Sequence, residues 1–527
     1  MSLRNPLLSA LLLGLAAAAC SGNDATGAGT PNGSPPDSAD SGSSSSADGK
    51  SPGQPGTPAP ARCTAASGDY AGIDTSKVTT GTAPAGCLAF DVATGTLALA
   101  LDGARGALLL SAENGQIHAN GVACKAASGA PATTANTTIT VTGSTGDDTL
   151  VLDLGAGALG ALHVDMGGGT DAVFIKGSAK SDAIVAGSDH EKVMLDLSGD
   201  SVAETDIANG ENFLVSLGPG DDSFRATGGK DVGGTATAAF TVYGGAGNDT
   251  LGGGRMSDAL CGEAGNDTFV ATSSADGADQ YEGGDGIDRA DYSARTGAIA
   301  VHLDDVANDG EDKEGDDVRS TVEDIIGGAG DDVLTGTSGR NAIFGGPGND
   351  TILGGAGDDM LDGGPGDDTF DEDSAANGAD VVNGGPGVDT VLYEHRAVAL
   401  TVTLCRALSV DTGCALPACS CAADDGEAGE RDNLVNVESL EGGSGNDTLS
   451  GDETDNTISG HAGNDILRGN GGDDYLYGDD GADDLAGGEG DDFLDGAKML
   501  DIFNGGAGDG DICVIEAGEG HAACELY

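Results

Sequence analysis

The sequence predicts an all-β protein: a parallel β-roll, or β-solenoid, with a degenerate β region on its N-terminal side. Three observations lead to this fold class. Nine-residue units follow one another in register, and residues 345–371 read GGPGNDTIL, GGAGDDMLD and GGPGDDTFD. The chain holds 94 Gly, 3% aromatic residues and no Trp, which disfavours a conventional core of large side chains. Its formal net charge is −66, so a compact fold needs cations to offset self-repulsion.

Residues 1–19 have the pattern of a bacterial export signal. Arg4 supplies a short positive region, and the apolar stretch that follows is too short for a stable transmembrane helix. Ala17-Ala18-Ala19-Cys20 resembles a lipoprotein signal, in which the cysteine is acylated and becomes the new N-terminus, although Ala17 replaces the usual Leu. We therefore predict an outer-membrane lipoprotein anchored at Cys20 and located at the cell surface or outside the cell. An ordinary cleaved secretory peptide is the alternative.

Residues 20–62 are predicted to be a disordered tether. Ser, Gly, Pro and Asp dominate this segment, and its apolar residues have no periodicity. A flexible spacer directly after an acylated cysteine would hold a folded body away from a membrane surface.

Residues 63–240 are expected to extend the β structure before the regular repeats begin. We interpret 63–136 as an N-terminal β cap, held by Cys63, Cys87 and Cys124, and 137–240 as a degenerate β-solenoid. Strand-like alternation is present in both parts. The segments GSTGDDTLV and LGPGDDSFR echo the nine-residue unit, which makes Asp148 and Asp222 weaker candidates for cation ligands.

Residues 241–527 contain the regular repeats and an internal duplication. Residues 244–326 and 345–441 share one plan: three units, a linking stretch with a lone unit, an alternating segment and an acidic loop. We therefore interpret 289–326 and 390–441 as inserted loops. The acidic loop at 304–317 has no fixed ligand spacing, so a solvated loop is favoured over a further cation site.

Each position of the unit has a physical reason. Gly tolerates positive φ and close approach, so G-G-x-G forms a tight turn. The following x-U-x is a short strand whose apolar residue U points inward. Two units complete one coil, and coils stack at about 4.8 Å. The inward residues then form a continuous stripe: Leu334, Ile343, Ile352, Leu361 and Phe370, and later Leu449, Ile458, Leu467, Leu476, Leu485 and Leu494.

The same stacking brings carboxylates together. The Asp at the sixth place of one unit lies over the Asp two units away, and such a pair repels unless a cation sits between. Carboxylate and backbone carbonyl oxygens in a flexible cage suit Ca²⁺ better than Mg²⁺, which demands tighter octahedral geometry. We predict several Ca²⁺ ions, with these ligands: Asp249, Asp258, Asp267, Asp288, Asp332, Asp350, Asp359, Asp368, Asp389, Asp447, Asp465, Asp474, Asp483 and Asp492.

These units resemble the calcium-binding nonapeptide repeats of the RTX, or haemolysin-type, family, whose pattern is G-G-x-G-x-D-x-U-x. The pattern G-G-x-G-x-D occurs strictly in nine segments of the sequence. The resemblance implies a parallel β-roll with Ca²⁺ between successive turns, which folds only when Ca²⁺ is present. Asn341, Asn456 and Gly510 depart from the pattern by replacing the Asp of their units. Members of the family usually carry a C-terminal secretion signal and few Cys. The N-terminal signal and the ten further Cys of this chain instead favour export by the general pathway.

The cysteines favour disulfides over metal ligands. Beyond Cys20 ten remain, an even number in a chain that is predicted to be exported. Cys405, Cys414, Cys419 and Cys421 crowd into one loop, but CALPACSC lacks paired C-x-x-C spacing, so a zinc site is the less favoured alternative. The connectivity stays open.

The sequence favours a structural or adhesive protein over an enzyme. The acidic charge excludes nucleic acid as a partner. H-E-x-x-H, G-x-S-x-G and phosphate-binding motifs are absent, and the seven His are scattered. We therefore predict a surface-tethered, Ca²⁺-dependent solenoid without catalytic activity, which contacts a cell-surface or polysaccharide partner. The alternative is a hydrolase with its catalytic region in 63–240, for which the repeats serve as a folding aid.

Overall fold

The computed structural model describes residue 87 and residues 90–101, 107–135, 137–198, 203–405, 425–508, 510–515, 520–522 and 524–526. The predicted export signal, the predicted tether and Cys63 lie outside these residues. The chain divides into two units, Met1–Thr57 and Pro58–Tyr527, and the second is described below. All its assigned elements within the described residues are β-strands. Among these residues there is also no helix with the length and hydropathy needed to span a membrane.

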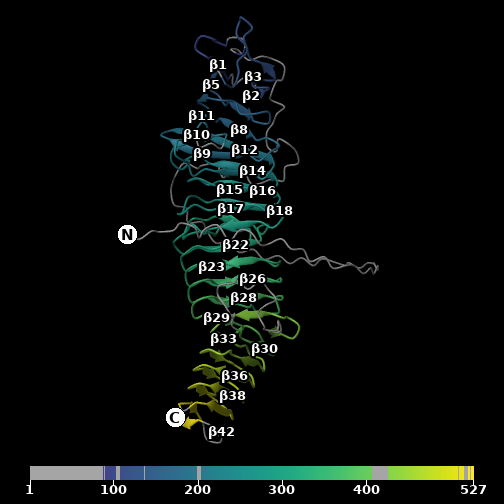
Figure 1. Cartoon of the computed structure of the whole chain (residues 1–527), viewed down its shortest axis with the longest axis vertical. Coiled ribbons are helices and arrows are strands. Elements are labelled where there is room, and N and C mark those ends of the chain that lie inside the picture. The colour runs from purple at the N-terminus through teal and green to yellow at the C-terminus, as the bar shows by residue number, and fades with distance from the viewer. Residues whose placement is uncertain are drawn as a thin grey trace, which may run out of the picture. The chain divides into compact units, whose positions relative to one another are not determined.

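Two large sheets, mostly parallel, carry the N-terminal and central strands (Figure 1). The 15-stranded sheet has the order β1 (Thr96–Ala100), β5 (Thr138–Ser144), β7 (Leu162–Gly167), β11 (Thr205–Ala208), β10 (Lys192–Asp196), β9 (Ala183–Asp189), β13 (Ser223–Arg225), β15 (Thr250–Gly252), β17 (Thr268–Val270), β19 (Arg289–Asp291), β22 (Asp324–Ile326), β24 (Ala342–Phe344), β26 (Met360–Asp362), β28 (Val381–Asn383) and β32 (Asn433–Val435). The ten-stranded sheet has the order β21 (Asp317–Val318), β18 (Gln280–Asp285), β16 (Ala259–Ala264), β14 (Phe240–Ala246), β12 (Asn212–Pro219), β8 (Ala172–Lys176), β6 (Thr149–Asp153), β2 (Leu108–Glu113), β3 (Gln116–Ala119) and β4 (Val122–Ala123).

Two further sheets carry the C-terminal strands. The 11-stranded sheet has the order β20 (Ala300–His302), β23 (Val333–Thr335), β25 (Thr351–Leu353), β27 (Thr369–Asp371), β29 (Thr390–Leu392), β33 (Ser439–Glu441), β35 (Thr457–Ser459), β37 (Tyr475–Tyr477), β39 (Phe493–Asp495), β41 (Ile512–Val514) and β43 (Glu525–Leu526). The seven-stranded sheet has the order β31 (Gly426–Glu427), β30 (Leu400–Thr403), β34 (Thr448–Ser450), β36 (Ile466–Gly471), β38 (Asp484–Glu489), β40 (Ile502–Ala507) and β42 (Gly520–Ala522).

Successive strands alternate between two sheets, and each insertion exchanges one sheet of the pair. From β14 to β19 the chain alternates between the ten-stranded and 15-stranded sheets. The first insertion contributes β20, which begins the 11-stranded sheet, and β21, which ends the ten-stranded one. The second contributes β30 and β31, which begin the seven-stranded sheet, and β32, which ends the 15-stranded one. The segments 289–326 and 390–441 therefore contain strands of the solenoid itself.

The coil length and the buried stripe agree with the nine-residue pattern. Strand β24 pairs in parallel with β26 in the register Ala342↔Met360 and Ile343↔Leu361, which is one coil of 18 residues. The central residue of each short strand is buried because alternate side chains face the interior. All the predicted stripe residues lie in one hydrophobic cluster that also includes the core of 137–240. The predicted fold class is thus confirmed.

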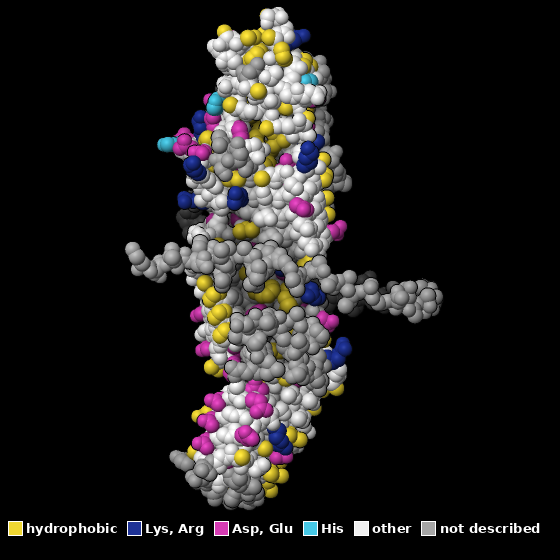
Figure 2. Space-filling model, viewed as in Figure 1, with side chains coloured by type: hydrophobic (Ala, Val, Ile, Leu, Met, Phe, Trp, Pro, Cys, Tyr) yellow, Lys and Arg dark blue, Asp and Glu magenta, His cyan; other side chains and the backbone are white. Residues whose placement is uncertain are grey.

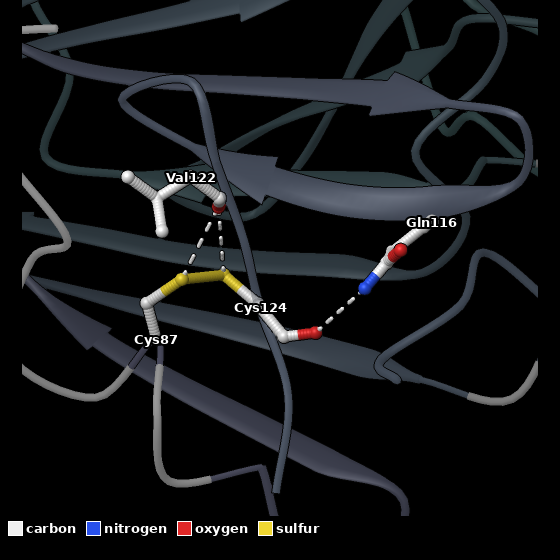
Figure 3. Close-up of a disulfide and its surroundings, with 4 residues drawn as sticks. All are labelled: Cys87, Gln116, Val122 and Cys124. Carbon is white, nitrogen blue, oxygen red and sulfur yellow. Dashed lines mark hydrogen bonds between the residues drawn. A yellow bond between two sulfur atoms is a disulfide. The ribbon is translucent and has the colours of Figure 1, made fainter. Parts of the chain in front are cut away.

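The N-terminal end of the described solenoid is closed by antiparallel strands. Strands β2, β3 and β4 pair in sequence at the edge of the ten-stranded sheet. A disulfide joins Cys87 to Cys124 directly after β4, with Cα atoms 4.6 Å apart (Figure 3). Gln116 Nε2 donates a hydrogen bond to the Cys124 carbonyl at 3.4 Å. A second disulfide, Cys513–Cys524, lies near the C-terminal end of the sequence.

Each insertion builds the same buried ionic cluster. In the first copy Arg295 is fully buried and donates to Glu314 Oε1 at 2.7 Å and to Asp276 Oδ1 at 3.1 Å. The hydroxyl of buried Tyr292 donates to Asp316 Oδ2 at 3.0 Å. A buried charge is tolerated when it is paired and hydrogen-bonded in this way. The cluster therefore fixes the path of the chain where one sheet replaces another.

The second copy repeats these contacts. Arg396 is fully buried and donates to both oxygens of Glu430, at 3.0 and 3.1 Å, and to Asn377 Oδ1 at 3.1 Å. Tyr393 donates to Asp432 Oδ2 at 3.0 Å. The motif Y-x-x-R, followed by D-G-E-x-x-E-x-D, is shared by the two copies.

The expectation of a solvated acidic loop at 304–317 is wrong for its second part. Residues 304–308 are exposed, but Asp309 and Asp316 are buried. Asp309 accepts hydrogen bonds from the backbone N–H groups of His302 and Val318, at 2.7 and 2.8 Å. These carboxylates lie inside because backbone N–H groups and the Tyr292 hydroxyl replace the water they lose.

Candidate metal centres

The sixth-place Asp residues form ladders that run from coil to coil. The backbone N–H of Asp332 donates to Asp350 Oδ1, and that of Asp350 donates to Asp368 Oδ1, both at 2.8 Å and 18 residues apart. The same contact joins Asp465 to Asp483 at 2.8 Å. The predicted stacking of carboxylates one coil apart is therefore confirmed. We call each such series a ladder.

The second oxygen of most ladder carboxylates has no partner. In 11 of the 14 predicted ligands the Oδ2 atom is buried and accepts no hydrogen bond: Asp249, Asp267, Asp288, Asp350, Asp359, Asp368, Asp389, Asp465, Asp474, Asp483 and Asp492. These side chains are at most 2% exposed. A buried acceptor without a partner is costly, so each of these atoms is suited to a ligand that brings positive charge.

In each of the other three predicted ligands the Oδ2 atom accepts a hydrogen bond from the backbone. Asp258 and Asp332 accept backbone N–H groups at Oδ2 from Gly254 and Gly328, both at 2.6 Å. Asp447 accepts one in the same way, from the residue four positions before it, at 3.0 Å.

The first Gly of the unit leaves space beside the unpartnered oxygen. A Cβ on Gly345 would meet Asp350 Oδ2 and lie 2.7 Å from the carbonyl oxygen of Gly363 in the next coil. The equivalent Cβ on Gly469 would meet Asp474 Oδ2 and lie 2.6 Å from another carbonyl oxygen. We call this space the cradle. It is lined by carboxylate and carbonyl oxygens, which are the ligands that Ca²⁺ prefers.

The side chains that could bind a metal ion are spread along the ladder rather than clustered. No group of three His, Cys, Asp or Glu side chains placed to hold a metal ion occurs among the described residues. A cation in a cradle would therefore take its remaining ligands from backbone carbonyl groups and water. The residues present fit Ca²⁺ on these terms, because its coordination is large and flexible.

Burial raises the pKa of the ladder carboxylates. The pKa of Asp350 rises to about 7, first because burial disfavours the charged form and then because Asp332 and Asp368 add negative charge nearby. The hydrogen bond from the Asp332 N–H opposes this rise. The pKa reaches about 7 for the same leading reason at Asp249, Asp288, Asp359, Asp389, Asp465 and Asp474. Without a cation, these sites hold charge only at a cost in stability.

The departures from the repeat pattern have particular places in the ladders. Asn341 and Asn456 occupy the sixth place, and each accepts a backbone N–H at Oδ1 at 2.8 Å. The substitution at Gly510 is corrected by a shift of one residue: Asp511 takes the ladder position, and its Oδ1 accepts the N–H of Asp492 at 3.1 Å. The last unit has therefore kept its carboxylate.

Further ladder carboxylates lie outside the nine-residue pattern. Asp279 and Asp380 accept N–H groups from Asp258 and Asp359 at 2.8 and 2.7 Å. They belong to the segments ADGAD and ANGAD, whose recurrence in the duplication is the signal that could have identified them.

The fifth place of the unit forms a second ladder on the surface. The N–H of Asp473 donates to Asp455 Oδ1, and that of Asp491 donates to Asp473 Oδ1, both at 2.8 Å. These three side chains are exposed, and Figure 2 shows acidic side chains gathered around the C-terminal strands. The repeat pattern G-G-x-G-x-D-x-U-x leaves this position unspecified. Its preference for Asn or Asp follows from the need for a short side-chain acceptor.

The weaker metal candidates have different outcomes. Asp148 is saturated by the Ser144 N–H at 2.6 Å. Asp222 has an unpartnered buried Oδ2, and burial raises its pKa to about 6. Cys405 is in a disulfide, which argues against the zinc alternative, and the remaining members of that cysteine cluster lie outside the described residues.

In a comparison with protein families, segments of the chain match the RTX calcium-binding nonapeptide repeat. The matched segments are 241–269, 321–352, 335–370, 374–392, 441–476, 460–494 and 477–512. Search of curated proteins found no match to the chain.

Proposed function

Because residues 241–512 of this chain carry RTX calcium-binding nonapeptide repeats, we propose that it is an exported, surface-tethered β-solenoid which binds several Ca²⁺ ions and acts as a structural or adhesive protein. The observation that carries the Ca²⁺ binding is the series of buried Oδ2 atoms without partners, which recur from coil to coil in the ladders. A cation in each cradle would satisfy these atoms and neutralise part of the charge of −66.

Calcium binding is tested by calorimetric titration of the mature protein, residues 20–527, after treatment with EGTA. We expect more than one Ca²⁺ per chain and much weaker binding of Mg²⁺, because Mg²⁺ keeps its waters and requires a tighter cage. Equal responses to Ca²⁺ and Mg²⁺ would argue for diffuse screening of surface charge. The absence of any response to Ca²⁺ would refute the proposal.

The described part of residues 63–240 supports a role without catalysis. His163 Nδ1 contacts Asp206 Oδ2, and Lys192 Nζ donates to Asp206 Oδ1 at 2.5 Å. His163 and Lys192 are about half exposed, on β7 and β10, the two strands that flank β11 in the 15-stranded sheet. An ion pair of this kind on a sheet surface needs no catalytic explanation.

We also propose that acylation of Cys20 anchors the chain to the outer membrane. The support is the sequence pattern alone: a short apolar stretch, small residues before the cysteine and a long polar segment after it. The test is membrane fractionation of the wild-type protein and a Cys20→Ser variant. We expect the wild type in the outer-membrane fraction and the variant outside it, and identical distributions would contradict the anchor.

A further inference from the structure

The described turns of the repeat have two conformations, which differ at the residue four positions before the Asp. In a closed turn the N–H of that residue donates to the Asp of the same turn, as Gly328 does to Asp332 at 2.6 Å. In an open turn that residue has a positive φ, as Gly346 does at 100°, and its N–H instead donates to the next coil, here to the carbonyl of Gly363 at 3.0 Å. In the open turn the carboxylate keeps an unpartnered Oδ2, as in Asp350.

The open conformation persists where the residue is not glycine. Glu263, His461, Asn470 and Asp479 have φ values of 78°, 64°, 78° and 65°, in the left-handed region that side chains disfavour. Each lies four residues before an Asp whose Oδ2 is buried without a partner. A relaxed backbone would turn the N–H toward that carboxylate and satisfy it. A cation in the cradle would favour the open turn, because the cation needs an Oδ2 atom that does not already accept the N–H of its own turn.

Closed turns are found where a ladder begins. Asp332 and Asp447 are first members: their Oδ1 atoms accept the N–H groups of Ile299 and Leu400, which are not ladder residues, at 3.0 and 2.9 Å. Their Oδ2 atoms accept N–H groups of their own turns. Both carboxylate oxygens are therefore occupied by protein donors before any cation is considered.

The two Asn substitutions also lie at the start of a ladder. The N–H of Asn341 donates to Asp359 Oδ1 at 2.7 Å, so Asn341 precedes a ladder of carboxylates. Its own Oδ1 accepts the N–H of Thr337 at 2.8 Å, and its Nδ2 donates to the Glu323 carbonyl at 2.6 Å. A neutral amide with an N–H donor suits a turn that binds no cation. Asn456 has the same closed arrangement, with the N–H of Asp452.

The far end of two ladders is closed by tyrosine. Asp316 and Asp432 accept the last N–H groups of their ladders at Oδ1, from Asp279 and Asp380, at 2.9 and 3.0 Å. Their Oδ2 atoms accept the buried hydroxyl groups of the two insertion clusters. The duplicated insertions thus end a ladder at the place where they exchange a sheet.

We propose that closed turns bind no Ca²⁺ and open turns do, so that the Ca²⁺ array is divided into separate ladders, each starting at a cation-free turn. Asn341 and Asn456 are then starting positions rather than lost sites, and Asp258, Asp332 and Asp447 are not Ca²⁺ ligands despite matching the repeat. This inference rests on the proposed function. Beyond that function, it states which of the turns that match the repeat bind Ca²⁺.

The test counts Ca²⁺ per chain in the mature full-length protein, by equilibrium dialysis and elemental analysis at saturating Ca²⁺. Asp332→Asn and Asp350→Asn are a matched pair on adjacent coils of one ladder. We expect Asp332→Asn to retain the wild-type count and Asp350→Asn to lower it by at least one. Asn341→Asp is expected to leave the count unchanged. Circular dichroism at saturating Ca²⁺ checks that each variant is folded.

Asp447→Asn and Asp465→Asn form a second matched pair, used if a variant of the first does not fold. Equal losses in both members of a pair, or a gain of Ca²⁺ in Asn341→Asp, would overturn the division into closed and open turns. A wild-type chain that binds Ca²⁺ with such variant results would still retain the proposed function. A wild-type chain that binds none would overturn that function, and this inference with it.

Discussion

Removal of Ca²⁺ with EGTA at pH 7.5 is expected to abolish most of the β-sheet signal of the mature protein. The 11 unpartnered Oδ2 atoms would then be left buried beside one another without a counter-ion. An unsatisfied buried polar group costs about 1–3 kcal/mol. Even at about 1 kcal/mol each, the total is comparable with the whole stability of a typical domain, about 5–15 kcal/mol. The fold of the repeats and the binding of the ion are therefore one equilibrium.

Far-UV circular dichroism during titration of the EGTA-treated protein with Ca²⁺ measures this effect. We expect a cooperative return of the β signal, because each coil uses its neighbours to bury its apolar residue. Mg²⁺ at the same concentrations is the control and should restore little. A spectrum that is unchanged by EGTA would contradict the prediction. In that case the disulfides and the buried stripe would suffice to hold the fold.

Acidification is expected to restore part of the fold of the Ca²⁺-free protein. The pKa of Asp350 is about 7 in the folded chain, against 3.8 for an ordinary Asp. The folded state therefore binds more protons than the unfolded state between these values, and its stability falls as pH rises through this window. Lowering the pH from 8 to 5 neutralises the ladder carboxylates and removes the cost of burying their charge.

The measurement is the β signal of the Ca²⁺-free protein at a series of pH values between 8 and 5. The ion pair between Arg295 and Glu314 should survive this change, because contact with Arg295 helps to hold the pKa of Glu314 below its usual value. Protein saturated with Ca²⁺ at pH 8 is the control for full folding. A Ca²⁺-free signal that is equal or lower at pH 5 would show that carboxylate charge is not what prevents folding.

The sequence by itself determined the coil and its core. A period of nine residues with an apolar eighth place can bury that residue only if units stack, and Leu361 pairs with Ile343 one coil away as this requires. The sequence also determined the type of ligand at the candidate sites. Gly leaves room for oxygen ligands, and Asp350 and its equivalents each supply a carboxylate oxygen. The duplication was visible as well, since its motifs recur in order.

The tertiary structure decided which of these carboxylates keep a buried oxygen without a hydrogen-bond partner. Asp332 and Asp350 belong to identical patterns, G-G-x-G-x-D, yet one accepts the N–H of its own turn and the other does not. The difference lies in a backbone angle at the second residue of the turn, and glycine permits both conformations. At Asp332 and Asp447, the Oδ1 atom accepts the N–H of an insertion residue, Ile299 or Leu400, instead of that of a ladder Asp.

The burial of the acidic residues in the insertions also could not be predicted from the sequence alone. Their acidic residues suggest a solvated loop when they are considered without partners, because charged groups are rarely buried alone. Folding places Arg295 and Tyr292, which lie earlier in the chain, against these carboxylates and makes their burial possible. Sequence spacing determined the repeating unit because that unit is local. The Oδ1 hydrogen bonds of a ladder join residues one coil apart, so they depend on how the coils stack.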